Sequence, residues 1–103
     1  MLSLGEGVAM VARVARFKGQ PDRFISGKYR WVLDAIRSVD GFEAAYHLVD
    51  EDAGDSVSIS IFASRESAGE AEQAVNAARE RLGLDASPPD AVQTWRVVDS
   101  TRR

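Results

Sequence analysis

The spacing of apolar residues changes along the chain, and these changes divide it into predicted elements. In 57–62, three β-branched residues alternate with Ser58, Ser60 and Phe62, and this period of two indicates a strand with two distinct faces. In 64–82, small apolar residues recur every three or four positions, which indicates a helix with one buried stripe. Segment 42–49 reads as a further strand, and the acidic, glycine-containing turn 50–55 joins it to 57–62 in an antiparallel hairpin.

The remaining segments give the chain an alternating order. Segment 8–17 is apolar on both faces and predicts a strand, and 91–98 predicts the last one. Segment 22–38 has helical spacing, and we expect Gly27 to weaken this helix by about 1 kcal/mol relative to Ala without breaking it. Ser64 is a suitable N-cap for the second helix, and Gly83 a suitable terminator.

The order β-α-β-β-α-β predicts an α+β, ferredoxin-like fold, with a four-stranded antiparallel sheet and two helices on one face. The length suits a single domain over 1–103, with a structured core over about 8–98.

We expect the two faces of this sheet to have different surroundings. We expect one face to pack on the helices through Phe42, Tyr46, Leu48, Val57, Ile59 and Ile61. The uncovered face would then carry Val11, Arg13, Ala15, Phe17, Ala45, His47, Val49, Ser58, Ser60 and Phe62, joined by Trp95 with Val97 or by Thr94 with Val98. Because so much apolar area is unfavourable in water, we expect a second copy to cover it, giving a homodimer with a barrel-like interior.

Composition excludes several classes of function. The net charge of −3 lacks the basic footprint of a nucleic-acid binder, and no stretch approaches the length of a membrane span. Without cysteine and with one histidine, the chain offers no metal site of those ligands. The acidic turn is too short for an EF-hand loop, so we expect no metal. With no secretory signal pattern at its start, we expect a soluble cytoplasmic protein.

Several short motifs carry a family resemblance. They are Ala12 to Pro21, Asp40-Gly41-Phe42, Leu48-Val49-Asp50 and Ser58 to Ser67. These segments resemble the strands and turns of antibiotic-biosynthesis-monooxygenase-like domains, in the dimeric α/β-barrel superfamily. The resemblance covers roughly 8–98 and implies a homodimer whose paired sheets form a dimeric α/β barrel.

The resemblance also implies possible chemistry, because members of this superfamily include cofactor-independent oxygenases of aromatic substrates and haem-degrading enzymes. The active enzymes use an Asn, a Trp, and an Arg or His inside the barrel. Here Ala15 (or Ala12) stands at the position of that Asn, Phe62 at that of a common Trp, and Ala63 at that of a Glu. These departures leave open whether the chain is an enzyme, and we expect no cofactor.

Two residues are candidates for catalysis. His47 would act as an acid, base or haem ligand, or else as a structural histidine on its strand. Arg13 would bind an anionic substrate group, or else pair with an acid across the dimer or reach the surface at the mouth of the barrel. The candidate ligand-binding residues are Ala15, Ser58, Ser60, Phe62 and Trp95, whereas we assign Trp31 to helix packing.

Three functions remain open at this point. The first is a homodimeric domain that binds a small, mostly apolar or aromatic ligand between its sheets. The second is a cofactor-independent monooxygenase acting on an aromatic substrate. The third is a purely structural or regulatory dimerisation module, which would have a completely filled interior.

Overall fold

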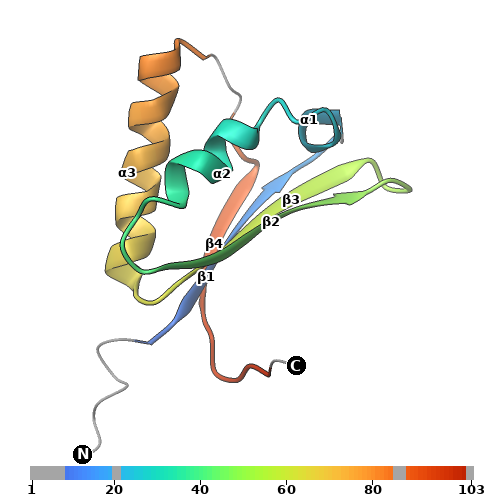
Figure 1. The fold of residues 1–103 in the computed structure, drawn as a ribbon. Coiled ribbons are helices and arrows are strands. Elements are labelled where there is room, and N and C mark those ends of the chain that lie inside the picture. Colours follow the sequence, from blue (N-terminus) through green and yellow to red (C-terminus); the bar gives the residue numbers. More distant parts are fainter. Residues whose placement is uncertain (1–8, 20–21, 85–87, 102–103) are drawn as a thin grey trace, which may run out of the picture.

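The computed structural model describes residues 9–19, 22–84 and 88–101, which form one sheet and three helices (Figure 1). In chain order the elements are β1 (Val11–Phe17), α1 (Asp22–Ile25), α2 (Arg30–Ile36), β2 (Phe42–Asp50), β3 (Asp55–Phe62), α3 (Arg65–Leu82) and β4 (Ala91–Arg96). No helix within the described ranges is both long enough and apolar enough to cross a lipid bilayer.

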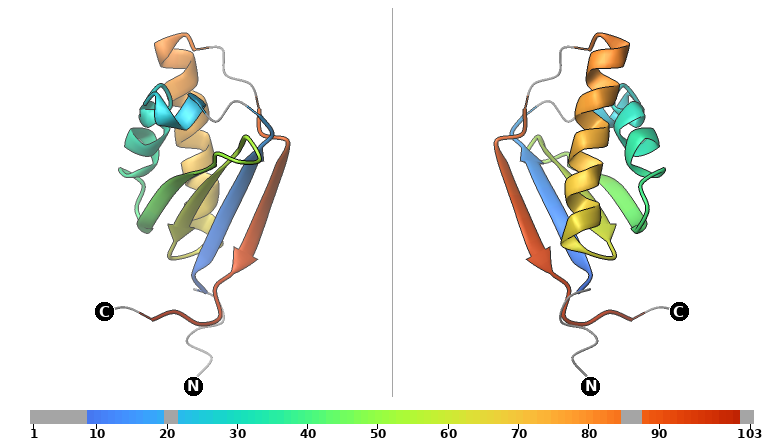
Figure 2. Two further views of the ribbon diagram at one scale, coloured as in Figure 1. Left: turned by 90° about the vertical axis from the view of Figure 1, so that its right-hand side faces the viewer. Right: turned by 90° about the vertical axis from the view of Figure 1, so that its left-hand side faces the viewer.

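The sheet has the strand order β2-β3-β1-β4, and every neighbouring pair is antiparallel. The helices lie on one side of this sheet, and the described chain leaves the other side open (Figure 2). This confirms the predicted ferredoxin-like α+β fold. The two central strands, β1 and β3, therefore lie directly beneath the helices.

The first predicted helix is interrupted, which corrects our expectation for Gly27. The structure places α1 and α2 on either side of 26–29, and Gly27 has a φ of 78°. This left-handed conformation cannot continue an α-helix, and it is one that glycine adopts at little cost. The glycine therefore turns the chain, so that α2 leaves α1 in a new direction.

The longest helix has the ends that its sequence predicts. The hydroxyl oxygen of Ser64 accepts a hydrogen bond from the Ser67 backbone N–H at 3.1 Å, and Gly83 closes the last turn by donating to Arg79 and Glu80 carbonyls. Ala68 and Ala71 on this helix are buried against Phe62 of β3, in a core that includes Val11 and Ile36. Helix α3 is thus anchored over one end of the sheet.

The assignment of the sheet faces from sequence is wrong. Phe62, predicted for the uncovered face, is fully buried beneath the helices, whereas Tyr46 and Leu48, predicted to pack on the helices, are 57% and 45% exposed. The pairing register places Ile59 opposite Tyr46 and Val14, so these residues share the open face. The physical reason is that both faces are apolar, and alternation alone does not say which of two apolar faces the helices cover.

A β-bulge moves Phe42 to the other face from its predicted neighbours. The register shifts between Phe42 and Ala44, so that Phe42 pairs with Phe62 while Ala44 pairs with Ile61. The rings of Phe42 and Phe62 meet edge to face with their centroids 6.1 Å apart. Phe42 therefore packs under the helices as predicted, although Tyr46 and Leu48 do not.

Candidate ligand-binding cavity

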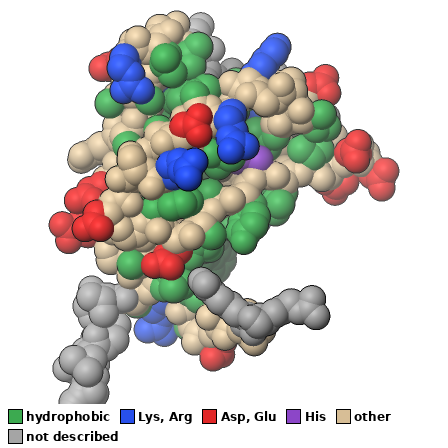
Figure 3. All heavy atoms as spheres, in the orientation of Figure 1, with side chains coloured by type: hydrophobic (Ala, Val, Ile, Leu, Met, Phe, Trp, Pro, Cys, Tyr) green, Lys and Arg blue, Asp and Glu red, His purple; other side chains and the backbone are tan. Residues whose placement is uncertain are grey.

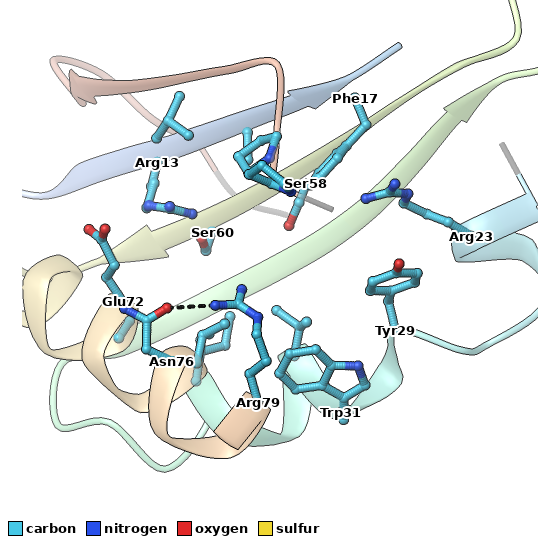
Figure 4. A pocket seen from close by; sticks show the side chains of 18 of the residues that line it. Arg13, Phe17, Arg23, Tyr29, Trp31, Ser58, Ser60, Glu72, Asn76 and Arg79 are labelled. Atoms are coloured by element: carbon cyan, nitrogen blue, oxygen red, sulfur yellow. Dashed lines mark hydrogen bonds between the residues drawn. The ribbon is translucent and has the colours of Figure 1, made fainter. Parts of the chain in front are cut away.

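A cavity of about 480 Å³ lies between the sheet and its helices (Figure 4). Strands β1 and β3 form its floor, and α2 and α3 form the opposite wall. It exists because Ala15, Ser58 and Ser60 are small at the place where the floor passes beneath the helices. Its volume falls within the range of pockets that hold small organic molecules.

Aromatic side chains from two strands, one helix and the turn before that helix line this cavity. Phe17 comes from the end of β1, Phe62 from β3 and Trp31 from α2, and Tyr29 directly precedes α2. Aliphatic residues fill the wall between them, among them Val32, Ile36, Val75 and Val92. Flat, apolar walls of this kind favour a flat, apolar ligand.

Three guanidinium groups enter the same cavity, from Arg13, Arg23 and Arg79. Arg23 is 7% exposed, and its guanidinium carbon lies 4.3 Å from the ring centroid of Phe17 and 4.8 Å from that of Tyr29. Such cation–π contacts hold a charged group against an aromatic wall. Among the described lining residues the acid is Glu72, so positive charge predominates and favours an anionic ligand.

Helix α3 contributes a polar row to the cavity. Glu72, Asn76 and Arg79 all line it, and an Nη1 atom of Arg79 donates to Asn76 Oδ1 at 2.9 Å. The Nε atom of Arg79 is buried, and among the described residues it has no hydrogen-bond partner. A buried guanidinium N–H without a partner is costly, which marks this atom as a ready donor to a ligand.

His47 lies outside the cavity lining. Its ring stacks on that of Phe24 from α1, and its Nε2 atom is buried without a hydrogen-bond partner among the residues the structure describes. Desolvation by burial lowers the pKa of His47 to about 4, and the positive charge of Arg30 adds to the effect. His47 is only partly visible at the surface, beside basic side chains (Figure 3). At neutral pH the imidazole is therefore uncharged and a weak base.

The structure thus brings together most, but not all, of the predicted site residues. Arg13 shares one cavity with four of the candidate ligand-binding residues, which are Ala15, Ser58, Ser60 and Phe62. Trp95 does not, because it pairs with Ala12 on the open face and is 54% exposed. This cavity lies between the sheet and the helices of one chain, whereas the predicted ligand space between two paired sheets stays a prediction.

Residues that the sequence reasoning passed over complete the site. Glu72, Asn76 and Arg79 are spaced four and three residues apart, beside the buried stripe of Ala68, Ala71 and Val75. Polar residues at that spacing share a helix face, so a polar row bordering an apolar stripe is the signal that was available. Trp31, which we assigned to packing, lines the cavity as well.

The acidic turn has a structural role in its own hairpin. Asp50 Oδ1 accepts hydrogen bonds at 3.1 Å from the backbone N–H groups of Asp52 and Ala53, and Asp55 Oδ1 accepts one from Gly19. In the parts of the chain that the structure describes, no three acids or histidines are grouped as a metal ion would require.

Comparison with known proteins identifies solved structures that have the same fold. A scan against protein-family models found no match, and a search of curated proteins found none either. Among solved structures, the chain is similar to Rv0793 from Mycobacterium tuberculosis, with 26% identity and a TM-score of 0.63 over 91% of this chain and 100% of that one.

Two further structures carry functional names. An antibiotic biosynthesis monooxygenase-like protein from Chloroflexus aurantiacus is 14% identical with a TM-score of 0.64, over 91% of this chain and 98% of its own. SnoaB from Streptomyces nogalater, a cofactor-independent oxygenase, is 18% identical with a TM-score of 0.63, over 92% of this chain and 99% of its own. As its strand and turn motifs predicted, the chain has the fold of the antibiotic-biosynthesis-monooxygenase-like proteins.

Proposed function

We propose that the protein binds a small, flat, aromatic molecule with a negatively charged group in the cavity beneath its helices. The observation that carries this proposal is the composition of the lining, where four aromatic residues and three guanidinium groups surround one space. The third hypothesis, a dimerisation module with a filled interior, is less well supported because this space exists.

The lining contains separate groups that favour the aromatic ring and the negative charge of such a ligand. Burying the faces of an aromatic ring against Phe17, Trp31 and Phe62 is favourable by about 25 cal/mol per Å² of apolar area. A neutral apolar ligand would displace water from the guanidinium groups of Arg13 and Arg79 without offering them an acceptor, whereas an anion would pair with them. The serine hydroxyls of the floor would orient polar substituents.

We further propose that a second copy of the chain covers the open sheet face. This face presents Tyr46, Leu48 and Trp95 at 57%, 45% and 54% exposure, on strands whose other faces are turned to the helices. An open sheet face with exposed apolar residues on both edge strands is typical of an interface between subunits. The two-fold dimer would leave each cavity inside its own protomer.

Calorimetric titration with 2-naphthoate tests the ligand-binding proposal. The wild-type protein should bind it, and Ala15→Leu, which fills space at the 3%-exposed floor position, should weaken binding by about tenfold or more. Ala77→Leu makes the same change on α3 away from this lining and should leave affinity unchanged. Absence of binding by the folded wild type, or equal binding by Ala15→Leu, would contradict the proposal.

Cofactor-independent oxygenation is a second candidate, favoured by the same guanidinium groups. They would stabilise a phenolic or enolic ligand as its anion, the form that reacts with oxygen directly. The fold of the oxygenase SnoaB agrees with this, although at 18% identity it supports the fold alone. Oxygen uptake with a dihydroxyanthrone, lost in Arg79→Gln, would favour turnover, and binding of that probe without uptake would favour a binding protein.

A further inference from the structure

The guanidinium group of Arg79 is held on one side and open on the other. Its Nη1 atom donates to Asn76 Oδ1 at 2.9 Å, which fixes the rotation of the planar group about the end of its side chain. Its Nε atom is buried and has no hydrogen-bond partner among the described residues. The edge with Nη1 is therefore hydrogen-bonded to Asn76, and the edge with Nε is free to bind a ligand.

The open edge carries two parallel N–H donors. In any arginine, Nε and the Nη2 atom beside it form a fork whose spacing matches the two oxygens of a carboxylate. Figure 4 shows this edge turned away from Asn76 and into the cavity, toward the side where Tyr29 and Trp31 lie. A group bound there would place the rest of its molecule against those aromatic rings.

Among the residues that the structure describes, none fills this fork. Glu72 is the acid among the described lining residues, and it lies beyond Asn76, on the side of the guanidinium away from the open edge (Figure 4). The ion pair between Arg30 and Asp34, at 3.8 Å, is on the exposed surface of α2. The buried Nε–H group thus requires an acceptor that a ligand would bring.

We propose that the anionic group of the ligand is a carboxylate, bound through both its oxygens by the Nε–Nη2 edge of Arg79. Asn76 is a positioning residue that acts through Arg79 and does not touch the ligand. This inference rests on the proposed ligand-binding function and narrows it to aromatic carboxylic acids. A single-oxygen anion such as a phenolate would use one donor of the fork and leave the other unmatched.

A pair of ligands of equal shape tests this inference. Calorimetry would compare 2-naphthoate with 2-naphthamide, which replaces the charged carboxylate by a neutral amide on the same ring. The wild type should bind 2-naphthoate about tenfold or more tightly than 2-naphthamide, since hydrogen bonds to charged groups are the stronger ones. Arg79→Lys, which keeps the charge and loses the fork, should remove most of this preference.

The positioning role of Asn76 has its own readout. Asn76→Ala should weaken the binding of 2-naphthoate more than that of 2-naphthamide, a selective loss that general damage to the fold would not produce. Arg81→Lys changes an exposed arginine on the same helix and should retain the wild-type preference.

The outcomes separate this inference from the function on which it rests. Equal wild-type affinity for both ligands, or an unchanged preference in Arg79→Lys, would overturn the carboxylate assignment and leave aromatic binding intact. Failure of the wild type to bind either ligand would overturn both. A preference that disappears in Arg79→Lys and survives in Arg81→Lys would establish the assignment.

Discussion

The rings of Phe24 and His47 lie face to face, with their centroids 3.9 Å apart and their planes 15° from parallel. Phe24 belongs to the four-residue helix α1, and His47 to the edge strand β2. This stack holds a very short helix against the sheet. Arg23 directly precedes Phe24 in the chain and lines the cavity. The stack therefore also helps to position one wall of the candidate site.

Lowering the pH should destabilise the protein through His47. Its pKa is about 4 in the folded protein, against 6.5 for an unperturbed histidine. Below pH 6.5 the unfolded chain takes up a proton that the folded chain does not, so stability is lost as the pH falls from 6.5 to 4. The loss should stay below about 3.5 kcal/mol, since the two pKa values differ by about 2.5, one pKa unit corresponds to about 1.4 kcal/mol, and solvent screens the partly exposed ring. Urea unfolding at a series of pH values measures it.

His47→Phe is the matched control for this titration. The variant keeps a flat ring beside Phe24 and removes the one histidine of the chain. Carboxylates titrate alike in both proteins, so the difference between the two pH profiles isolates His47. Parallel profiles between pH 6.5 and 4 would show that the imidazole is not desolvated in the folded state.

Substituting Gly27 should destabilise the fold despite the open space around it. Apart from its chain neighbours, no described residue has an atom within 4 Å of where a Cβ would be, but the φ of 78° is unfavourable for any residue with a side chain. Gly27→Ala should therefore cost about 1–2 kcal/mol, measured by chemical denaturation.

Gly69→Ala is the same chemical change, but it should affect the stability of the protein in the opposite direction. Gly69 lies inside α3, and apart from the neighbouring turns of that helix a Cβ there also meets no atom of the described residues within 4 Å. Alanine at this position should stabilise the protein by about 0.5–1 kcal/mol, since it lowers the entropy of the unfolded chain and favours the helix. The backbone account of Gly27 would be wrong if both variants changed stability in the same direction.

Charging the open sheet face should dissociate the proposed dimer. Trp95→Glu places a carboxylate on the edge strand β4 at a position that is 54% exposed in the protomer. Burying that charge between two sheets is unfavourable, so sedimentation should change from twice the chain mass of 11.2 kDa to that mass itself.

Leu82→Glu serves as the control for this experiment. Leu82 is also half exposed, at 50%, but it lies at the end of α3 on the helical side of the sheet. The Leu82→Glu variant should sediment as the wild-type protein does. A wild-type protein that sediments at 11.2 kDa at micromolar concentration would contradict the dimer proposal.

The order of elements could be predicted from sequence because each left a local signal. The alternation in 57–62, the acidic turn at 50–55 and the caps Ser64 and Gly83 all lie within a few residues of the structure they specify. The break at Gly27 was missed because its flanking residues keep helical spacing on both sides. A positive φ is a property of the backbone that residue spacing does not reveal.

The face of the sheet that the helices cover could not be predicted by the same reasoning. Val57, Ile59 and Ile61 are more hydrophobic than the serines between them, and we therefore placed them under the helices. The structure places Ser58 and Ser60 there instead, because small residues leave room for the cavity. If one face of a sheet lines a ligand site and the other meets a second copy, as we propose, the more apolar face need not be the one that the helices cover.

The location of a bound ligand tests the central claim most directly. Nuclear Overhauser effects between the ring protons of 2-naphthoate and the methyl groups of the protein report which surface it touches. We predict contacts to Val32, Ile36 and Val75, which line the cavity beneath the helices. Contacts to Leu48, Ile59 and Ile61 on the open face, with none to the cavity methyl groups, would contradict the account.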